Sequence, residues 1–160
     1  MAKHTLNSND EDLDFEAISI TCAEELYTTV ALIDAALGIE LQLAEHIAFT
    51  LKADKLFRFA LFQHVDEDLG IEYNLIPNLS NFEAGTEMTA GNDLFSQEKV
   101  EERTRLIREL PRTDYFLILK GAGTSHAALQ MMDLLRRCPE LTQVNQITVL
   151  DLPSRRNLIF

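Results

Sequence analysis

Apolar positions recur at steps of three and four residues over 26–37, the spacing that places them on one face of a helix. Gly38 follows where a left-handed residue ends a helix. Upstream, the apolar stretch 15–20 predicts a short strand. Thr21 and Glu24 then have the spacing of a capping box, in which the hydroxyl and the carboxylate each accept a backbone amide. We therefore predict a strand followed by a capped helix.

The period changes to two residues after this helix, which predicts strands. Apolar and polar residues alternate over 39–49, with a bulge expected near Glu45. They alternate again over 57–61 and 71–75, on either side of the polar loop 66–70. Two such runs around a short polar connection predict an antiparallel hairpin.

The second half of the chain predicts one buried strand, one helix and one final strand. The continuous apolar run 115–119 is typical of a strand that is buried on both faces in the centre of a sheet. Ser125 is placed to cap the helix that follows, and a last strand is expected over 143–150. The inward face of the helix is predicted to contain four apolar residues, Ala128, Leu129, Met132 and Leu135.

Two segments between these elements have no clear period. Residues 78–100 carry many Asn, Gly, Ser and acidic residues, and we expect a long mobile loop. Residues 102–109 fit either a helical turn or a strand. Pro111 prevents a helix from continuing through this region.

The order of the elements predicts an α+β fold, because helices and strands alternate too rarely for a doubly wound parallel sheet. We expect a mostly antiparallel or mixed sheet of five to six strands with two helices packed on one face. Residues 1–13 are predicted to be a disordered acidic tail and 14–152 a single domain. The C-terminal tail 153–160 ends in Leu-Ile-Phe, and such apolar residues dock on their own domain or insert into a partner.

Charge excludes some classes of partner. The 160-residue chain has a formal net charge of −12, which disfavours general binding to nucleic acid or to an anionic membrane surface. Residues 1–98 hold 19 acids and 4 Lys or Arg, a net charge of −15, whereas residues 99–160 hold 7 acids and 10 Lys or Arg, a net charge of +3. The two halves therefore attract each other, within one molecule or across a symmetric interface.

No signal peptide and no long apolar run is found, so we expect a cytoplasmic protein without a membrane segment. Cys22 and Cys138 lack the spacing of a metal site and are expected to be reduced thiols. The four histidines show no paired spacing either. The sequence therefore predicts no metal site, no cofactor and no catalytic residues.

The turn between the central strand and the second helix is a candidate ligand site. Gly121, Gly123, Thr124 and Ser125 would offer free backbone amides at the positive end of a helix dipole, which suits an anion. The pattern matches neither of the common nucleotide-binding glycine motifs. An ordinary capped turn is therefore the competing interpretation.

A nine-residue motif precedes the central strand. Ile107 is followed by Glu109 two residues later and by Asp114-Tyr115 at the end, and the apolar run starts at once. In this motif the chain resembles the IPExxxVDY family, an uncharacterised bacterial group, with Arg108 in place of its Pro and Thr113 in place of its Val. The family has no established activity, so the resemblance implies no catalytic role.

The motif has two physical interpretations. Its acids can accept backbone amides at a corner restricted by proline, or Asp114 and Tyr115 can form a binding surface. For the whole protein, our leading hypothesis is a non-catalytic interaction or regulatory module that self-associates as a homodimer or binds an unknown protein partner. The alternatives are a small-ligand or anion-binding domain that uses the Gly121–Ser125 turn, and an enzyme whose site is dispersed along the sequence.

Overall fold

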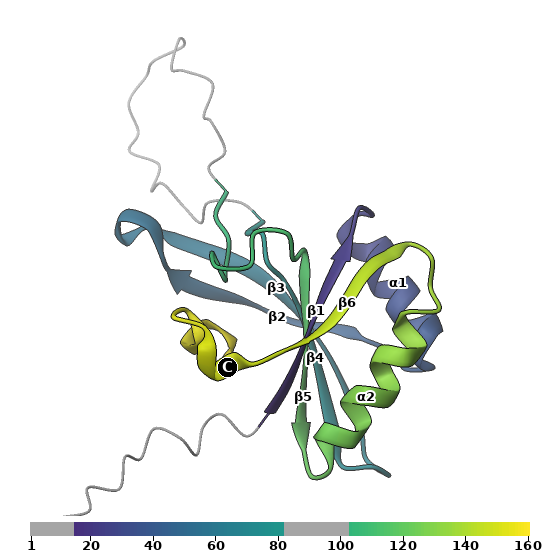
Figure 1. The fold of residues 1–160 in the computed structure, drawn as a ribbon. Helices are drawn as coiled ribbons and strands as arrows, with labels where there is room; N and C mark the ends of the chain where they lie inside the picture. The colour runs from purple at the N-terminus through teal and green to yellow at the C-terminus, as the bar shows by residue number, and fades with distance from the viewer. Residues whose placement is uncertain (1–14, 82–102) are drawn as a thin grey trace, which may run out of the picture.

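The computed structural model describes residues 15–81 and 103–160. They form one six-stranded sheet in which every neighbouring pair of strands is antiparallel, in the order β2-β3-β4-β5-β1-β6. The two helices cover one face of this sheet (Figure 1). The predicted α+β class is therefore confirmed. The strands are β1 (Phe15–Cys22), β2 (Gln42–Thr50), β3 (Leu56–Asp66), β4 (Ile71–Pro77), β5 (Tyr115–Gly121) and β6 (Leu141–Ile147), and the helices are α1 (Leu26–Leu37) and α2 (Thr124–Leu135).

The helices pack on the sheet through the apolar positions that their periodicity predicts, with one exception. Val30 and Ile33 of α1 and Met132 and Leu135 of α2 are at least nine-tenths buried in a common core. Leu129, which was predicted to face inward, is instead 53% exposed. It lies one position past Ala128, beyond the edge of the buried stripe, so that prediction was wrong.

The other face of the sheet is covered by irregular chain. Leu106 and Ile107, which precede β5, are fully buried against it, and the C-terminal tail covers the rest. The chain after β6 contains two short 3-10 helices, η3 (Val149–Asp151) before the tail and η4 (Arg155–Leu158) within it. Leu158 is completely buried, and Lys120 lies over the ring of Phe160 and donates to its backbone oxygen. The tail therefore packs on its own sheet.

The start of α1 differs from the prediction. The capping box of Thr21 and Glu24 does not form, because α1 begins at Leu26 and its N-cap is Glu25, without a side-chain hydrogen bond. Pairing with β6 continues β1 through Cys22, so Thr21 is still part of the strand. A residue held in a sheet ladder cannot also turn the chain into a helix.

Other local predictions were correct. Gly38 ends α1 in the left-handed region, with φ 68°, and its amide donates to Asp34. The register of β2 shifts between Leu43 and Glu45, which is the expected bulge. By contrast, the segment 102–109 was predicted to form a helical turn or a strand, and its described part, 103–109, forms neither a helix nor a strand apart from one bridge between Arg105 and Leu79, so that prediction was wrong.

The last strand, expected over 143–150, runs from Leu141 to Ile147, because the chain then turns into η3. The predicted acidic tail 1–13 and most of the predicted loop 78–100 lie outside the described residues.

Candidate functional site

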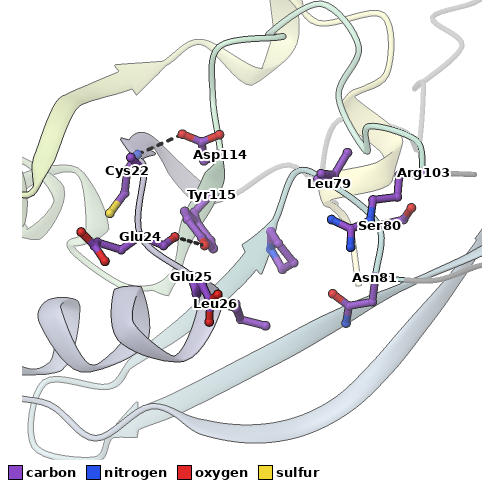
Figure 2. Close-up of a pocket in the computed structure, with 12 residues that line it drawn as sticks. Cys22, Glu24, Glu25, Leu26, Leu79, Ser80, Asn81, Arg103, Asp114 and Tyr115 are labelled. Carbon is purple, nitrogen blue, oxygen red and sulfur yellow. Dashed lines mark hydrogen bonds between the residues drawn. The ribbon is translucent and has the colours of Figure 1, made fainter. Parts of the chain in front are cut away.

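A pocket opens at one end of the sheet, where β1 and β4 end and where α1 and β5 begin. Its volume is about 550 Å³, which is within the range of roughly 300–1,000 Å³ common for small-molecule sites. Figure 2 shows side chains from these separate segments around the cavity. Its charged lining consists of the carboxylates of Glu24, Glu25 and Asp114 and the guanidinium of Arg103. This excess of carboxylates favours a ligand that carries a positive charge.

The last two residues of the nine-residue motif, Asp114 and Tyr115, build one wall of this pocket. The Asp114 carboxylate accepts the backbone amide of Cys22 at 3.0 Å, and the Tyr115 hydroxyl donates to the carbonyl oxygen of Glu24 at 3.2 Å. Burial raises the pKa of Tyr115 above its ordinary value. The neutral Tyr115 hydroxyl uses its proton in this hydrogen bond, which gives the side chain a structural role. Asp114 and Tyr115 therefore join the start of β5 to the segment that leads into α1.

The backbone of the corner before β5 is held by Asn78, which follows β4 and is completely buried. Its side-chain oxygen accepts the amide of Ile107 at 2.8 Å. Its side-chain nitrogen donates to three carbonyl oxygens, those of Thr113 at 2.9 Å, Leu110 at 3.0 Å and Ile107 at 3.4 Å. The corner of the chain between Ile107 and Thr113 thus wraps around the side-chain amide of Asn78.

Sequence reasoning missed Asn78. It lies just after Pro77 at the start of a segment with no period, and no spacing in the sequence distinguishes it from the other Asn residues there. Only the strand order brings the end of β4 next to the beginning of β5, where the corner lies.

The first two residues of the motif lie away from the pocket. Ile107 is fully buried in the core on the face opposite the helices. The Glu109 carboxylate accepts hydrogen bonds from the amide and the hydroxyl of Ser154, at 3.0 and 2.9 Å, and so fastens the C-terminal tail. Burial acts to raise the pKa of Glu109, but its own amide and Ser154 donate hydrogen bonds that outweigh burial and lower the pKa.

The acids of the motif accept backbone amides, as in the interpretation of the motif as a structural corner. The Asp114 carboxylate accepts the amide of Cys22, and the Glu109 carboxylate accepts the amide of Ser154. Both donors are distant in sequence from the motif. The motif residues do not form one site, because the structure brings only Asp114 and Tyr115 to the pocket.

The Gly121–Ser125 turn is built differently from the prediction. Gly123 is the N-cap of α2, with φ 74°, so Ser125 lies inside the helix and does not cap it. Its hydroxyl instead donates to the Glu16 carboxylate at 2.5 Å, while Thr124 is buried. A carboxylate beside the first turn of α2 already complements the helix dipole and repels a second anion. The turn is therefore a poor anion site.

A different surface is exposed at the edge of the sheet. Seven of the nine residues of β2 are exposed, and Ile47 and Phe49 are half-buried, so this edge strand is open on both faces as well as along its backbone. At the opposite edge, Arg136 donates two hydrogen bonds to the Val144 carbonyl oxygen, at 3.1 and 2.9 Å. The backbone of β6 is thus partly engaged by its own chain. Unpaired edges are ready surfaces for strand addition, and β2 is the more accessible of the two.

Comparisons with known proteins give no further identification. No protein-family model, curated protein or solved structure matches the chain. Within residues 15–81 and 103–160, no group of three or more His, Cys, Asp or Glu side chains is arranged to hold a metal ion. In the same part of the chain, none of the helices has the length and apolar character needed to cross a membrane.

Proposed function

We propose that this protein is a non-catalytic interaction module that self-associates. The observation that carries the proposal is the open edge strand β2, on which Leu43 is 44% exposed and Ile47 and Phe49 are only half-buried. A long edge strand with accessible apolar side chains can pair with a strand of another molecule through its backbone. Such pairing needs no catalytic group, and the fold needs no rearrangement to permit it.

Static light scattering after size-exclusion chromatography tests self-association directly. We expect a mass above that of the monomer at tens of micromolar protein, and a dependence of this mass on salt. A chain that stays monomeric across a hundredfold range of concentration, in low and in high salt, would contradict the proposal.

We also propose that the chain belongs to the IPExxxVDY family and acts in a bacterial cytoplasm. The motif residues Ile107, Glu109, Asp114 and Tyr115 support membership, because each makes a specific buried or hydrogen-bonded contact. Residues with such contacts are the ones that a family motif would retain. A crystal structure of an established family member with the same Asp–amide and Tyr–carbonyl contacts would test this assignment.

A second candidate function is the binding of a small ligand in the pocket beside α1. The pocket volume and its excess of carboxylates favour a cationic or zwitterionic ligand over an anion. A thermal-shift screen should then show stabilisation by polyamines or amino acids. Saturating ligand stabilises a fold by mass action, by about 2.7 kcal/mol at one hundred times the dissociation constant. Stabilisation by inorganic phosphate alone would contradict this interpretation.

A further inference from the structure

A second pocket lies at the β6 edge of the sheet, on the face opposite the helices. Its volume is about 420 Å³, and it shares no residue with the pocket beside α1. The floor is formed by two neighbouring cross-strand pairs of β1 and β6, Ser19 with Asn145 and Thr21 with Gln143. The corner before β5, residues 109–113, forms the wall.

The wall is held in place by the chain itself. The Asn78 side chain donates to the carbonyl oxygen of Leu110 at 3.0 Å, and Pro111 restricts the backbone that follows. The Thr21 hydroxyl donates to the carbonyl oxygen of Arg112 at 2.8 Å and so ties the wall to the floor. A ligand therefore meets a preformed pocket, which lowers the entropic cost of binding.

Two side-chain amides on the floor are available to a ligand. Gln143 and Asn145 are exposed, and within the described residues neither side chain makes a hydrogen bond. A carboxamide offers both a donor and an acceptor, and so matches the C=O and N–H of peptide groups. Residues two apart on a strand are about 6.6 Å apart, and peptide groups on one side of an extended chain have the same spacing. The two carboxamides therefore fit two successive peptide groups of an extended ligand.

Arg112 supplies a positive charge at one end of this floor. It lies at the Gln143 end, because Thr21 both pairs with Gln143 and donates to Arg112. In residues 15–81 and 103–160, the guanidinium of Arg112 has neither a hydrogen bond nor an ion pair. A planar guanidinium binds a carboxylate through two parallel hydrogen bonds. This end of the pocket therefore suits the carboxylate of a ligand.

The other end of the pocket carries a negative charge. Glu109 is bonded to Ser154, in the chain that continues from the Ile147 end of β6. Both bonds from Ser154 reach one oxygen, Oε1, which leaves acceptor capacity on the carboxylate for an ammonium group. A ligand with one charge at each end also has no net charge, whereas a plain anion is repelled by a chain with a net charge of −12.

We propose that this pocket binds a short peptide in an extended conformation, with its free carboxylate on Arg112 and its free ammonium group on Glu109. From Gln143 to Ile147 the strand spans about 13 Å at roughly 3.3 Å per residue, which matches an extended peptide of about three to four residues. Side chains of the peptide then contact the apolar groups that line the pocket, which belong to Leu110, Pro111 and Ile147. The site is independent of the self-association surface on β2.

Trialanine is a suitable probe, because it offers a peptide main chain and both charged ends without a specific side chain. In a two-dimensional NMR titration we expect shifts of the amide signals of 109–113 and 143–147, and little change at Glu24 and Glu25 in the pocket beside α1. Trialanine amide lacks the carboxylate and should bind at least about tenfold more weakly. Acetylated trialanine lacks the ammonium group and should bind at least about threefold more weakly.

Variants at exposed positions assign the contacts. Arg112→Gln should bind trialanine and its amide equally well, because the carboxylate has lost its partner. Gln143→Thr with Asn145→Thr removes both carboxamides and should weaken binding of trialanine at least about tenfold. Arg137→Gln, after α2, removes the same charge as Arg112→Gln at another exposed position and should bind trialanine within about twofold of the natural chain. Circular dichroism verifies the fold of each variant.

The outcomes either support the peptide site or exclude it. Localised shifts, a preference for the free carboxylate and loss of that preference in Arg112→Gln support it. The proposal is wrong if about 20 mM trialanine causes no shifts, since even a millimolar site would then be nearly saturated. It is also wrong if acetate alone binds as tightly as trialanine, or if the shifts centre on the pocket beside α1.

Acetylated trialanine distinguishes a free peptide from the C-terminal segment of a protein. Equal binding of trialanine and its acetylated form would show that the ammonium group is not recognised, and the free peptide would be the wrong ligand. All of these measurements are made on the natural chain and its variants whatever their oligomeric state. The peptide site can therefore fail while self-association stands, and self-association can fail while the peptide site stands.

Discussion

Replacement of Asn78 by alanine should be among the most damaging single changes in this protein. The Asn78 side chain is completely buried and makes three hydrogen bonds of 2.8–3.0 Å to the backbone of the corner before β5. Alanine leaves the buried amide of Ile107, the buried carbonyl group of Thr113 and the partly buried carbonyl group of Leu110 without their partner. At roughly 1 kcal/mol for each bond, and up to about 3 kcal/mol for a buried group left unpaired, we expect a loss of about 3–5 kcal/mol.

That loss is large compared with the total stability of a domain, which is about 5–15 kcal/mol. Urea denaturation followed by circular dichroism gives the free energy of unfolding from the midpoint and the slope. Asn145→Ala is the matched control, because Asn145 is exposed on β6 and should change stability by no more than about 0.5 kcal/mol. If Asn78→Ala costs less than about 1 kcal/mol, the corner does not depend on this amide.

Asn78→Asp adds a test of direction, because it keeps the shape and the acceptor but replaces the donor with a second acceptor. The new carboxyl group would face carbonyl oxygens in a buried site, so its pKa in the folded state must be higher than in the unfolded state, where it is about 3.9. Protonation then favours the folded form. The destabilisation should therefore be greatest above the folded pKa and should decrease as the pH falls toward the unfolded pKa.

Two further predictions concern the turn after β5 and the C-terminal tail. Gly121→Ala should lower the free energy of unfolding by about 3 kcal/mol in urea denaturation, because φ is 128° and the new Cβ would lie 2.2 Å from the carbonyl oxygen of Gly70. The control Gly38→Ala, whose Cβ meets no neighbouring atom at φ 68°, should lower it by only about 1 kcal/mol. Equal losses in the two variants would exclude the clash. The pKa of Glu109 is lower in the folded state than in the unfolded state, where it is about 4.3. The hydrogen bonds from Ser154 to Glu109 therefore stabilise the fold fully above the unfolded pKa, and this stabilisation is lost as the pH falls through the folded pKa. The stability difference between the natural chain and Glu109→Gln should shrink over that range, and a difference independent of pH would contradict the reasoning.

Periodicity predicted the elements because each strand and helix has to bury one face whatever its neighbours are. The local capping predictions failed for a different reason. Thr21 is held in β1 by pairing with a strand more than a hundred residues later, and Ser125 is bonded to Glu16 at the start of the fold. Residues that local spacing assigned to the helix ends are therefore paired instead with partners that are distant in sequence.

The pocket could not be predicted, because its residues come together only through the strand order. β1 lies between β5 and β6, and β4 lies beside β5. The end of β1, the end of β4 and the start of β5 are consequently neighbours, although 92 positions separate Cys22 from Asp114. No local pattern specifies such an order, so a motif that is continuous in sequence contributes only part of a site in space.

The charge distribution acquires a different meaning once the fold is known. Dividing the sequence at residue 98 indicated an acidic half and a weakly basic half that attract each other. The first 98 residues contain only four cations, however, and three of them, Lys52, Lys55 and Arg58, lie together at the tip of the β2–β3 hairpin. Because an antiparallel hairpin places its turn at the end opposite to the next turn, the acids around residues 66–68 lie far from that tip. A division of the sequence at residue 98 therefore does not describe how charge is distributed over the folded chain, because three of the four cations of the acidic half are gathered at one end of one hairpin.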